Sequence, residues 1–225
     1  EQLSGFAVEL HLGGHPTGIL DGADVVCVSG GVPLTIPLIK EAEDRGIPLT
    51  NDSQLFMEEV DARVIGITGS AGKTTTTVLI GAIAKAALEP KVKVWVGGNI
   101  GFPLIEHLEE IHPEDWVVHE FSSFQLEQMT LSPQIAVITN ITPNHLDRHK
   151  TMEAYTAAKT RILKFQSAKD FAVINREDPG SLNLAGLACS TCGRQRRDRP
   201  NPIDPARPDP TVAGTRAAGG HAWSL

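Results

Sequence analysis

Apolar and polar positions alternate in blocks along the middle of the chain. Short β-branched or aromatic runs, typical of buried strands, are followed by glycine-containing turns and then by longer runs with helical composition. These apolar runs predict strands at 63–68, 92–96, 116–120, 134–140 and 170–175. The longer runs predict helices at 73–88, 103–109, 124–129 and 151–166. Strands that alternate with helices predict an α/β fold, with a parallel sheet and helices on both of its faces.

A shorter unit of the same kind precedes this region. Its pattern predicts a strand at 24–29, a helix at 36–45 and a strand at 47–50. The first strand ends at Ser29-Gly30-Gly31, and the ends of parallel strands are where such sheets hold ligands. A plain strand-to-helix turn is an equally good interpretation of these residues. The unit is too short to close a doubly wound domain and does not begin with Met, so we expect a fragment.

The end of the chain loses the alternating pattern. It has no apolar period, is rich in proline and arginine, and contains no lysine. This composition predicts disorder, and an out-of-frame reading of a GC-rich gene would produce it as well. We therefore predict a partial Rossmann-like domain at 1–61, an incomplete central domain at 62–188, and a disordered or out-of-frame tail at 189–225.

Composition excludes several classes of function. The net charge of −7 at pH 7 gives no electrostatic case for binding nucleic acid or an anionic membrane. No apolar run approaches the ~18 residues of a membrane span, and no signal peptide is visible. Cys27, Cys189 and Cys192 form no disulfide framework, which predicts a reducing, cytoplasmic location. We interpret the C-x-x-C spacing of Cys189 and Cys192 as chance.

The strongest chemical motif is Gly69-Ser70-Ala71-Gly72-Lys73-Thr74-Thr75, between a predicted strand and a predicted helix. Glycines let backbone N–H groups approach a phosphate, and the helix N-terminus adds a positive dipole. Lys73 can reach the outer phosphates, and the Thr74 hydroxyl can bind Mg²⁺. Ile67 stands where the longer form of this motif has glycine, so the match is to the short form T-G-x-x-G-K-T-T. The alternative is an ordinary glycine turn before a helix.

Polar residues also follow the other strands, and the carboxyl ends of parallel strands lie at one edge of a sheet. Asn99 follows one strand, Glu120 ends another, and His145 lies in a polar loop after a third. Glu120 is well placed to share Mg²⁺ with Thr74, although a solvent-exposed glutamate is the alternative. His145 is suited to binding a metal, moving protons or capping a helix.

Lys159 stands out on the predicted helix 151–166. On a helical wheel it lies inside the apolar arc formed by Met152, Tyr155, Ile162 and Leu163. A lysine within an apolar face is costly unless it is paired or chemically altered. The alternative is a lysine whose stem covers the apolar patch while its ammonium group reaches water.

Together these stretches resemble the Mur ligases, the ATP-dependent amide-forming enzymes of peptidoglycan precursor synthesis. The resemblance rests on residues 66–76, 96–101, 120–127, 140–149 and 157–161, and it runs from near residue 10 to about residue 187. Within that family, the run Ser-Ser-Phe-Gln-Leu-Glu at 122–127 is specific to the ligase that adds D-glutamate to UDP-N-acetylmuramoyl-L-alanine.

The resemblance implies a role for each candidate residue. The loop 69–75 and Asn99 would bind ATP. Thr74 and Glu120 would hold one Mg²⁺, and His145 would serve a second Mg²⁺ with Lys159, which would be carbamylated by CO₂. The catalytic residues would be Lys73, His145 and Lys159. The nucleotide-sugar substrate would contact Ser29, Gly30, Asn99, Ser122 and Ser123.

The implied reaction begins when the alanyl carboxylate attacks the γ-phosphate of ATP. The amine of D-glutamate then attacks the acyl phosphate, which yields an amide, ADP and phosphate. This chain departs from the family at Asn144, where the family usually has an acidic residue. The family's C-terminal domain has no counterpart in 189–225, so we expect this chain alone to form no product. We expect a monomer.

Other interpretations compete with this one. The chain could be a nucleotide-binding fragment without activity, or belong to a different Mur or folylpolyglutamate-type ligase. A GTPase is disfavoured because the chain contains no Asn-Lys-x-Asp sequence for guanine. The Phe-Gln-Leu-Glu stretch favours the D-glutamate-adding ligase over its neighbours.

Overall fold

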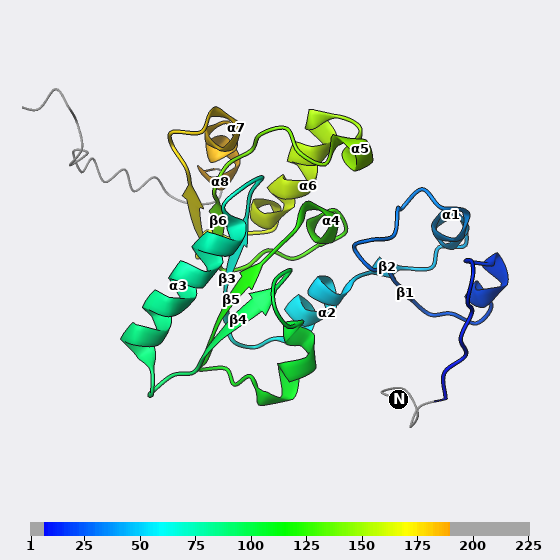
Figure 1. Cartoon of the computed structure of the whole chain (residues 1–225), viewed down its shortest axis with the longest axis horizontal. Helices are drawn as coiled ribbons and strands as arrows, with labels where there is room; N and C mark the ends of the chain where they lie inside the picture. Colours follow the sequence, from blue (N-terminus) through cyan, green and yellow to red (C-terminus); the bar gives the residue numbers. More distant parts are fainter. Residues whose placement is uncertain (1–6, 190–225) are drawn as a thin grey trace, which may run out of the picture. The chain divides into compact units, whose positions relative to one another are not determined.

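A five-stranded parallel sheet forms the centre of the structure, a computed structural model that describes residues 7–189 (Figure 1). The strand order is β4-β5-β3-β6-β7, and all four pairings are parallel. The strands are β3 (Arg63–Thr68), β4 (Val94–Gly98), β5 (Trp116–Glu120), β6 (Ile135–Ile138) and β7 (Phe171–Ile174). The predicted α/β fold is confirmed. The predicted tail lies outside the described residues, apart from Cys189.

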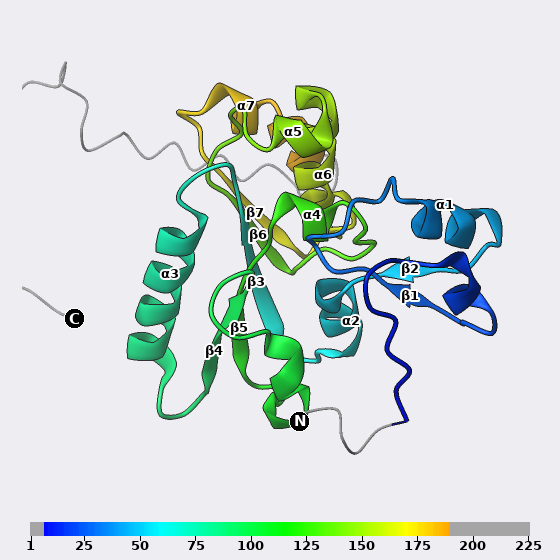
Figure 2. The same cartoon turned by 45° about the vertical axis from the view of Figure 1, so that its right-hand side comes forward.

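Helices cover both faces of this sheet (Figure 2). One face carries α3 (Lys73–Leu88), which packs over Ile67, Val94 and Val118. The opposite face carries α2 (Asp52–Glu59), α4 (Ser123–Leu126) and α6 (Met152–Lys164). Neighbouring residues of β5 enter different cores because side chains alternate along a strand. Val117 belongs to the α6 side and Val118 to the α3 side.

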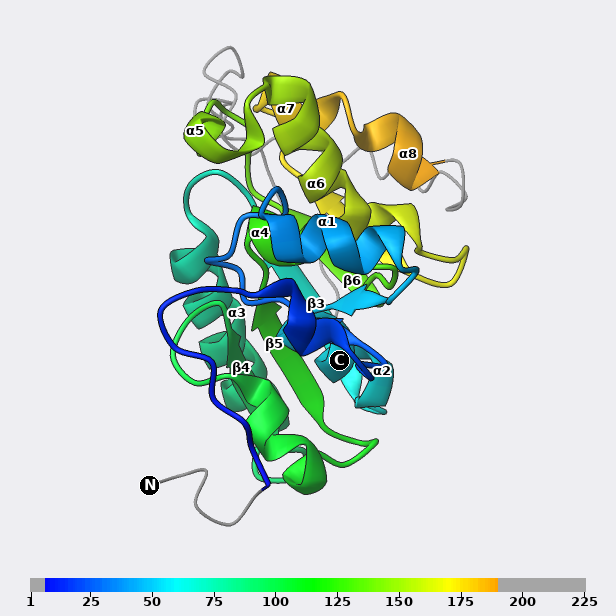
Figure 3. The ribbon, with the colours of Figure 1, turned by 90° about the vertical axis from the view of Figure 1, so that its right-hand side faces the viewer.

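The first part of the chain forms a small group of elements (Figure 3) with a core of its own. It contains the 3₁₀ helix η1 (Thr17–Leu20) and the helix α1 (Pro37–Asp44), with β1 (Val26–Cys27) and β2 (Leu49–Thr50) paired in parallel. Leu20, Leu38 and Ala42 are buried together there. The division between residues 61 and 62 stays a prediction.

The short elements differ most from the sequence prediction. Asn51 caps the unpredicted helix α2, because its side chain accepts a hydrogen bond from the N–H of Gln54. The segment predicted as helix 103–109 is the 3₁₀ helix η2 (Leu104–Glu110), and the predicted loop 141–150 contains α5 (Leu146–His149). Two further short helices, α7 (Pro179–Leu182) and α8 (Ala185–Cys189), follow β7. No helix within residues 7–189 combines the length and the apolar character that a membrane span requires.

His119 gives the sheet a pH-dependent stability. Its ring is stacked against Phe121 at 4.2 Å and lies 5.3 Å from Phe56, and burial lowers the pKa of His119 to about 4. In the unfolded chain the pKa of His119 is near 6.5. Between pH 6.5 and pH 4 the unfolded chain therefore binds a proton at His119 that the folded chain does not bind. The free energy of unfolding should therefore fall as the pH falls from 6.5 to 4, by roughly 3 kcal/mol.

The test is urea unfolding across this pH range. His119→Leu should remove most of the dependence, whereas His112→Leu, at an exposed histidine, should retain it. The same pH slope in His119→Leu and in the wild-type chain would contradict the assignment.

Candidate functional site

The phosphate-binding motif forms the turn between β3 and α3. Gly72 is the N-cap of α3 with φ 78°, a left-handed conformation that favours glycine. A Cβ atom at Gly69 would lie 1.9 Å from Thr139 Oγ1, so only glycine lets the two loops approach this closely. The N–H groups of Lys73, Thr74 and Thr75 have no intrahelical acceptor, because they occupy the first turn of the helix. These N–H groups, with their partial positive charge, and the Lys73 ammonium form the electropositive end of the site.

The front of the loop is braced by the protein itself. The N–H of Ser70 donates to Asn140 O at 3.0 Å, and the N–H of Ala71 donates to Asn140 Oδ1 at 2.9 Å. The Ser70 hydroxyl accepts from Tyr155 and donates to Thr142 O, at 2.9 and 2.8 Å. The N–H groups of Ser70 and Ala71 are therefore used within the protein, whereas those of the α3 first turn are free to bind a ligand.

Thr74, Glu120 and Asn99 meet at the carboxyl end of the sheet. Thr74 Oγ1 and Asn99 Nδ2 each donate to a different oxygen of the Glu120 carboxylate, both at 2.9 Å. The sheet register aligns Glu120 with Ile67 of β3 and with Gly98 of β4. The carboxylate is 1% exposed, which excludes the alternative of a solvent-exposed glutamate. The predicted proximity of Thr74 and Glu120 is present in the structure.

Lys159 lies beneath the phosphate loop and is 1% exposed, so it does not extend to water along the helix surface. Its ammonium group donates to Gly69 O at 2.8 Å and to Thr68 Oγ1 at 3.2 Å. Lys73 donates to the same Gly69 O, at 3.1 Å. Burial and, to a smaller extent, the Lys73 cation lower the pKa of Lys159 to about 7, against the opposing effect of the Glu120 carboxylate. The neutral form of Lys159 is therefore favoured far more than that of an exposed lysine.

His145 lies apart from this group. It is the N-cap of α5, has the left-handed φ of 51°, and is exposed. Its ring is 5.2 Å from that of Phe124. Within residues 7–189, no hydrogen bond or ion pair joins it to Lys159 or Glu120. The neighbouring Asn144 donates to Ser70 O at 3.3 Å, a bond that an ionised acidic residue could not make.

The predicted substrate residues divide between two locations. Ser29, Gly30, Asn99 and Ser122 line one cavity of about 680 Å³. Ser123 does not line it: this residue is buried, and its hydroxyl bonds with His149 Nε2 at 2.9 Å. Ser122 also caps α4 by accepting from the N–H of Gln125. Asn99 reaches both this cavity and Glu120, so it connects the two parts of the site.

Arg148 was not predicted as a site residue, yet it lines the same cavity. The Arg148 guanidinium donates to the carbonyls of Gly30 and Val32. No local pattern could have shown this contact, because its partners lie more than a hundred residues earlier in the chain.

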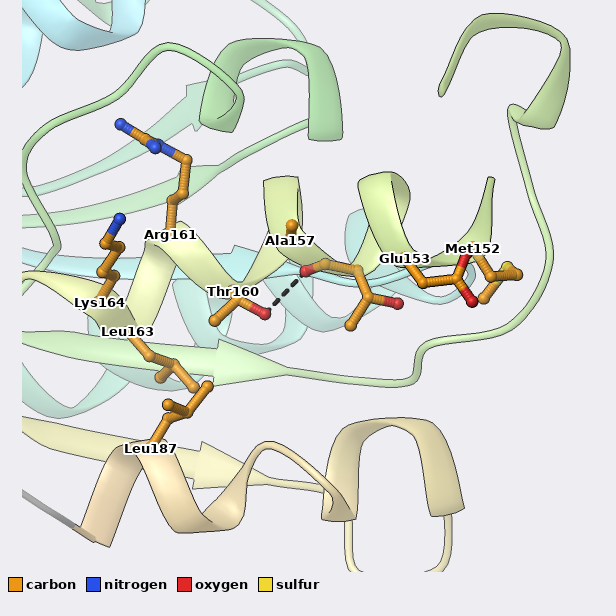
Figure 4. Close-up of a pocket in the computed structure, with 9 residues that line it drawn as sticks. Met152, Glu153, Ala157, Thr160, Arg161, Leu163, Lys164 and Leu187 are labelled. Atoms are coloured by element: carbon orange, nitrogen blue, oxygen red, sulfur yellow. Dashed lines mark hydrogen bonds between the residues drawn. The ribbon is translucent and has the colours of Figure 1, made fainter. Parts of the chain in front are cut away.

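A second cavity of about 690 Å³ lies between α6 and α8 (Figure 4). Its wall includes Met152, Thr160, Arg161 and Leu187, and Thr160 donates to Thr156 O at 2.7 Å. None of the predicted site residues lines it. Lys159 lies on the buried side of α6.

Comparisons with known proteins identify relatives of this chain. The UDP-N-acetylmuramoylalanine--D-glutamate ligase of Pelotomaculum thermopropionicum is 46% identical over 185 residues, which are 82% of this chain and 40% of that protein. The ligase of the same name from Symbiobacterium thermophilum is 49% identical over 167 residues, 74% of this chain and 36% of that protein. The chain thus spans less than half the length of these relatives.

A solved structure supports the fold. The UDP-N-acetylmuramate:L-alanyl-gamma-D-glutamyl-meso-diaminopimelate ligase from Neisseria meningitides superimposes with a TM-score of 0.52 at 19% identity, over 78% of this chain and 60% of that one. The model of the Mur ligase middle domain matches residues 67–194, which is more than half of this chain. The chain therefore belongs to the Mur ligase family.

Proposed function

We propose that this chain is the nucleotide-binding part of an ATP-dependent amide ligase of peptidoglycan precursor synthesis. The complete enzyme would join D-glutamate to the alanyl carboxylate of UDP-N-acetylmuramoyl-L-alanine through an acyl phosphate. The relatives named above carry the corresponding name. Because the substrates are nucleotide-linked precursors, we place the reaction in the cytoplasm.

One observation carries the proposal: the phosphate loop and the Glu120 carboxylate are joined at a single point by the Thr74 hydroxyl. Lys73 and the free N–H groups of the α3 first turn supply positive charge toward a phosphate chain. They lower the barrier to phosphoryl transfer by neutralising the charge that develops on the oxygens. The residues also orient the phosphates, which is most of what such a reaction requires of a protein.

The residues fit a magnesium ion. Thr74 and Glu120 offer hydroxyl and carboxylate oxygens, the ligands that Mg²⁺ prefers. Glu120 is buried, and among residues 7–189 it forms no salt bridge, so a cation is the natural complement of its charge. When bound, Mg²⁺ would neutralise the phosphates. The family resemblance implies a second Mg²⁺ at His145 and a carbamylated Lys159; among residues 7–189 no hydrogen bond or ion pair joins these two side chains, so we derive no step through that ion.

The cavity beside Asn99 is the proposed place for the nucleotide sugar. Its lining includes Ser29, Gly30 and Ser122. Asn99 holds Glu120 through its side chain and through its N–H, which donates to Glu120 O at 2.9 Å. The alanyl carboxylate of a sugar bound in this cavity would thus lie close to Glu120 and the phosphate loop.

The proposal is tested by an acceptor-dependent assay on the longest polypeptide that the gene encodes. With UDP-N-acetylmuramoyl-L-alanine, ATP and Mg²⁺, phosphate release should require D-glutamate. L-Glutamate, L-alanine and meso-diaminopimelate serve as controls, because other Mur ligases use other acceptors. Turnover with one of these in place of D-glutamate would reject the assigned substrate. ATP hydrolysis without any acceptor requirement would reject the ligase.

A further inference from the structure

The turn Ser29–Val32 carries two of the proposed substrate residues. It follows β1 and is closed by its own hydrogen bond, from the N–H of Val32 to Ser29 O at 2.9 Å. Within residues 7–189, the only hydrogen bonds that join this turn to another segment come from Arg148 on α5. The Arg148 Nη1 donates to Gly30 O at 3.0 Å, and Nη2 donates to Val32 O.

The guanidinium is held in place from its other side. Its Cζ atom lies 4.6 Å from the ring centroid of Phe124, a cation–π arrangement. Phe124 is also stacked on His149, with the centroids 5.2 Å apart and the planes at 9°. His149 is fixed in turn by its hydrogen bond to Ser123. The Ser29–Val32 turn and the Phe124 ring of α4 therefore orient the arginine before any ligand binds.

The chemistry of this contact requires arginine. A planar guanidinium presents donors in a rigid fork that can reach two carbonyls at once, whereas a lysine ammonium is a single compact charge. Arg148 is also the one cationic side chain among the described residues that line the cavity. Its two bonds to the turn use two of the five N–H donors of the guanidinium.

We propose that Arg148 is a positioning residue, which sets the Ser29–Val32 turn against α5 and thereby fixes one wall of the nucleotide-sugar cavity. The identity of the ligand rests on the proposed function, but the placement of the turn does not. Loss of the fork should loosen the turn and weaken nucleotide-sugar binding. ATP should be unaffected, because its proposed site is built from α3, β3 and β5.

The test compares Arg148→Met and Arg148→Lys with Arg161→Met. Arg161 is a matched control: its Nε donates to Met129 O at 2.7 Å, and its guanidinium lies 5.3 Å from the ring of Phe165. Hydrogen–deuterium exchange of peptides covering 26–36 reports on the turn without any ligand. Exchange there should be about tenfold faster in Arg148→Met and clearly faster in Arg148→Lys, and unchanged in Arg161→Met.

Binding provides the second measurement. The dissociation constant for UDP-N-acetylmuramoyl-L-alanine should rise about tenfold in both Arg148 variants, while that for ATP·Mg²⁺ stays within about twofold. Unchanged exchange in a folded Arg148→Met would overturn the inference, and so would equal losses for both ligands. If the wild-type chain binds no nucleotide sugar, the proposed function is at fault, and the exchange experiment alone decides the role of Arg148.

Discussion

Replacing Lys73 with Ala should weaken the binding of ATP·Mg²⁺ by at least about 30-fold, the effect of losing about 2 kcal/mol of a charge-assisted contact. Lys73 is the only lysine in the phosphate loop, and α3 supplies no other cation in its first turn. The one hydrogen bond of the Lys73 ammonium within residues 7–189, to Gly69 O, is replaceable by water or by Lys159. The variant should therefore fold normally, which circular dichroism can verify.

Isothermal titration calorimetry on the 225-residue chain measures this effect. Lys85→Ala is the control, because it removes the same charge from the last turn of the same helix, far from the loop. It should leave the affinity within about twofold, since exposed charges a Debye length or more away are screened. Equal affinity and stoichiometry in Lys73→Ala and the wild-type chain would contradict a phosphate-binding role.

Lys159 should carry a carbamate when the protein is supplied with bicarbonate and Mg²⁺. Its lowered pKa, about 7, leaves a large neutral fraction at neutral pH, where an ordinary lysine is almost wholly protonated. The neutral amine forms an N–C bond with CO₂ and releases a proton, which leaves an anionic carbamate. This product would replace the repulsion between Lys159 and Lys73 with attraction. It would also remove the cost of burying a second cation.

Carbon-13 NMR with labelled bicarbonate detects the carbamate directly, in a chain extended to the full length of its relatives. Lys159→Met should lose the signal and keep the fold, because an apolar side chain suits this buried position. Lys164→Ala, at the exposed end of the same helix, should keep the signal. The signal should grow as the pH rises through about 7, since only the unprotonated amine reacts. An equal signal in Lys159→Met would reject the assignment.

The sequence predicted the long elements well. β3, α3 and β5 have the boundaries expected from their apolar runs, because a buried strand or a sixteen-residue helix sums many consistent local preferences. Lys159 could also be recognised, since its place in the apolar arc depends only on helical periodicity. The proximity of Thr74 and Glu120 required one more assumption, that β5 pairs with β3, and the sheet order confirms it.

Other features could not be found this way. The roles of Asn140 as a brace for the loop and of Arg148 as a partner of the Ser29–Val32 turn depend on contacts between distant segments. Ser122 and Ser123 lie in different surroundings because the four-residue helix α4 begins between them. Ser122 is the N-cap, whereas the side chain of Ser123 bonds with His149. The short helices α2, which Asn51 caps, and α5 depend on local contacts and packing, and they are too short for a sequence period to reveal them.

Asn99 has a consequence for inhibitor chemistry. One side chain bonds with the carboxylate beside the phosphate loop and also forms part of the wall of the cavity proposed for the nucleotide sugar. Two ligand fragments, a polyphosphate mimic and a uridine-sugar mimic, would therefore sit on either side of a single amide group. A short tether between them would convert the second binding event into an intramolecular one, with an effective concentration in the millimolar range. Weak fragments joined across Asn99 should bind far more tightly than either alone.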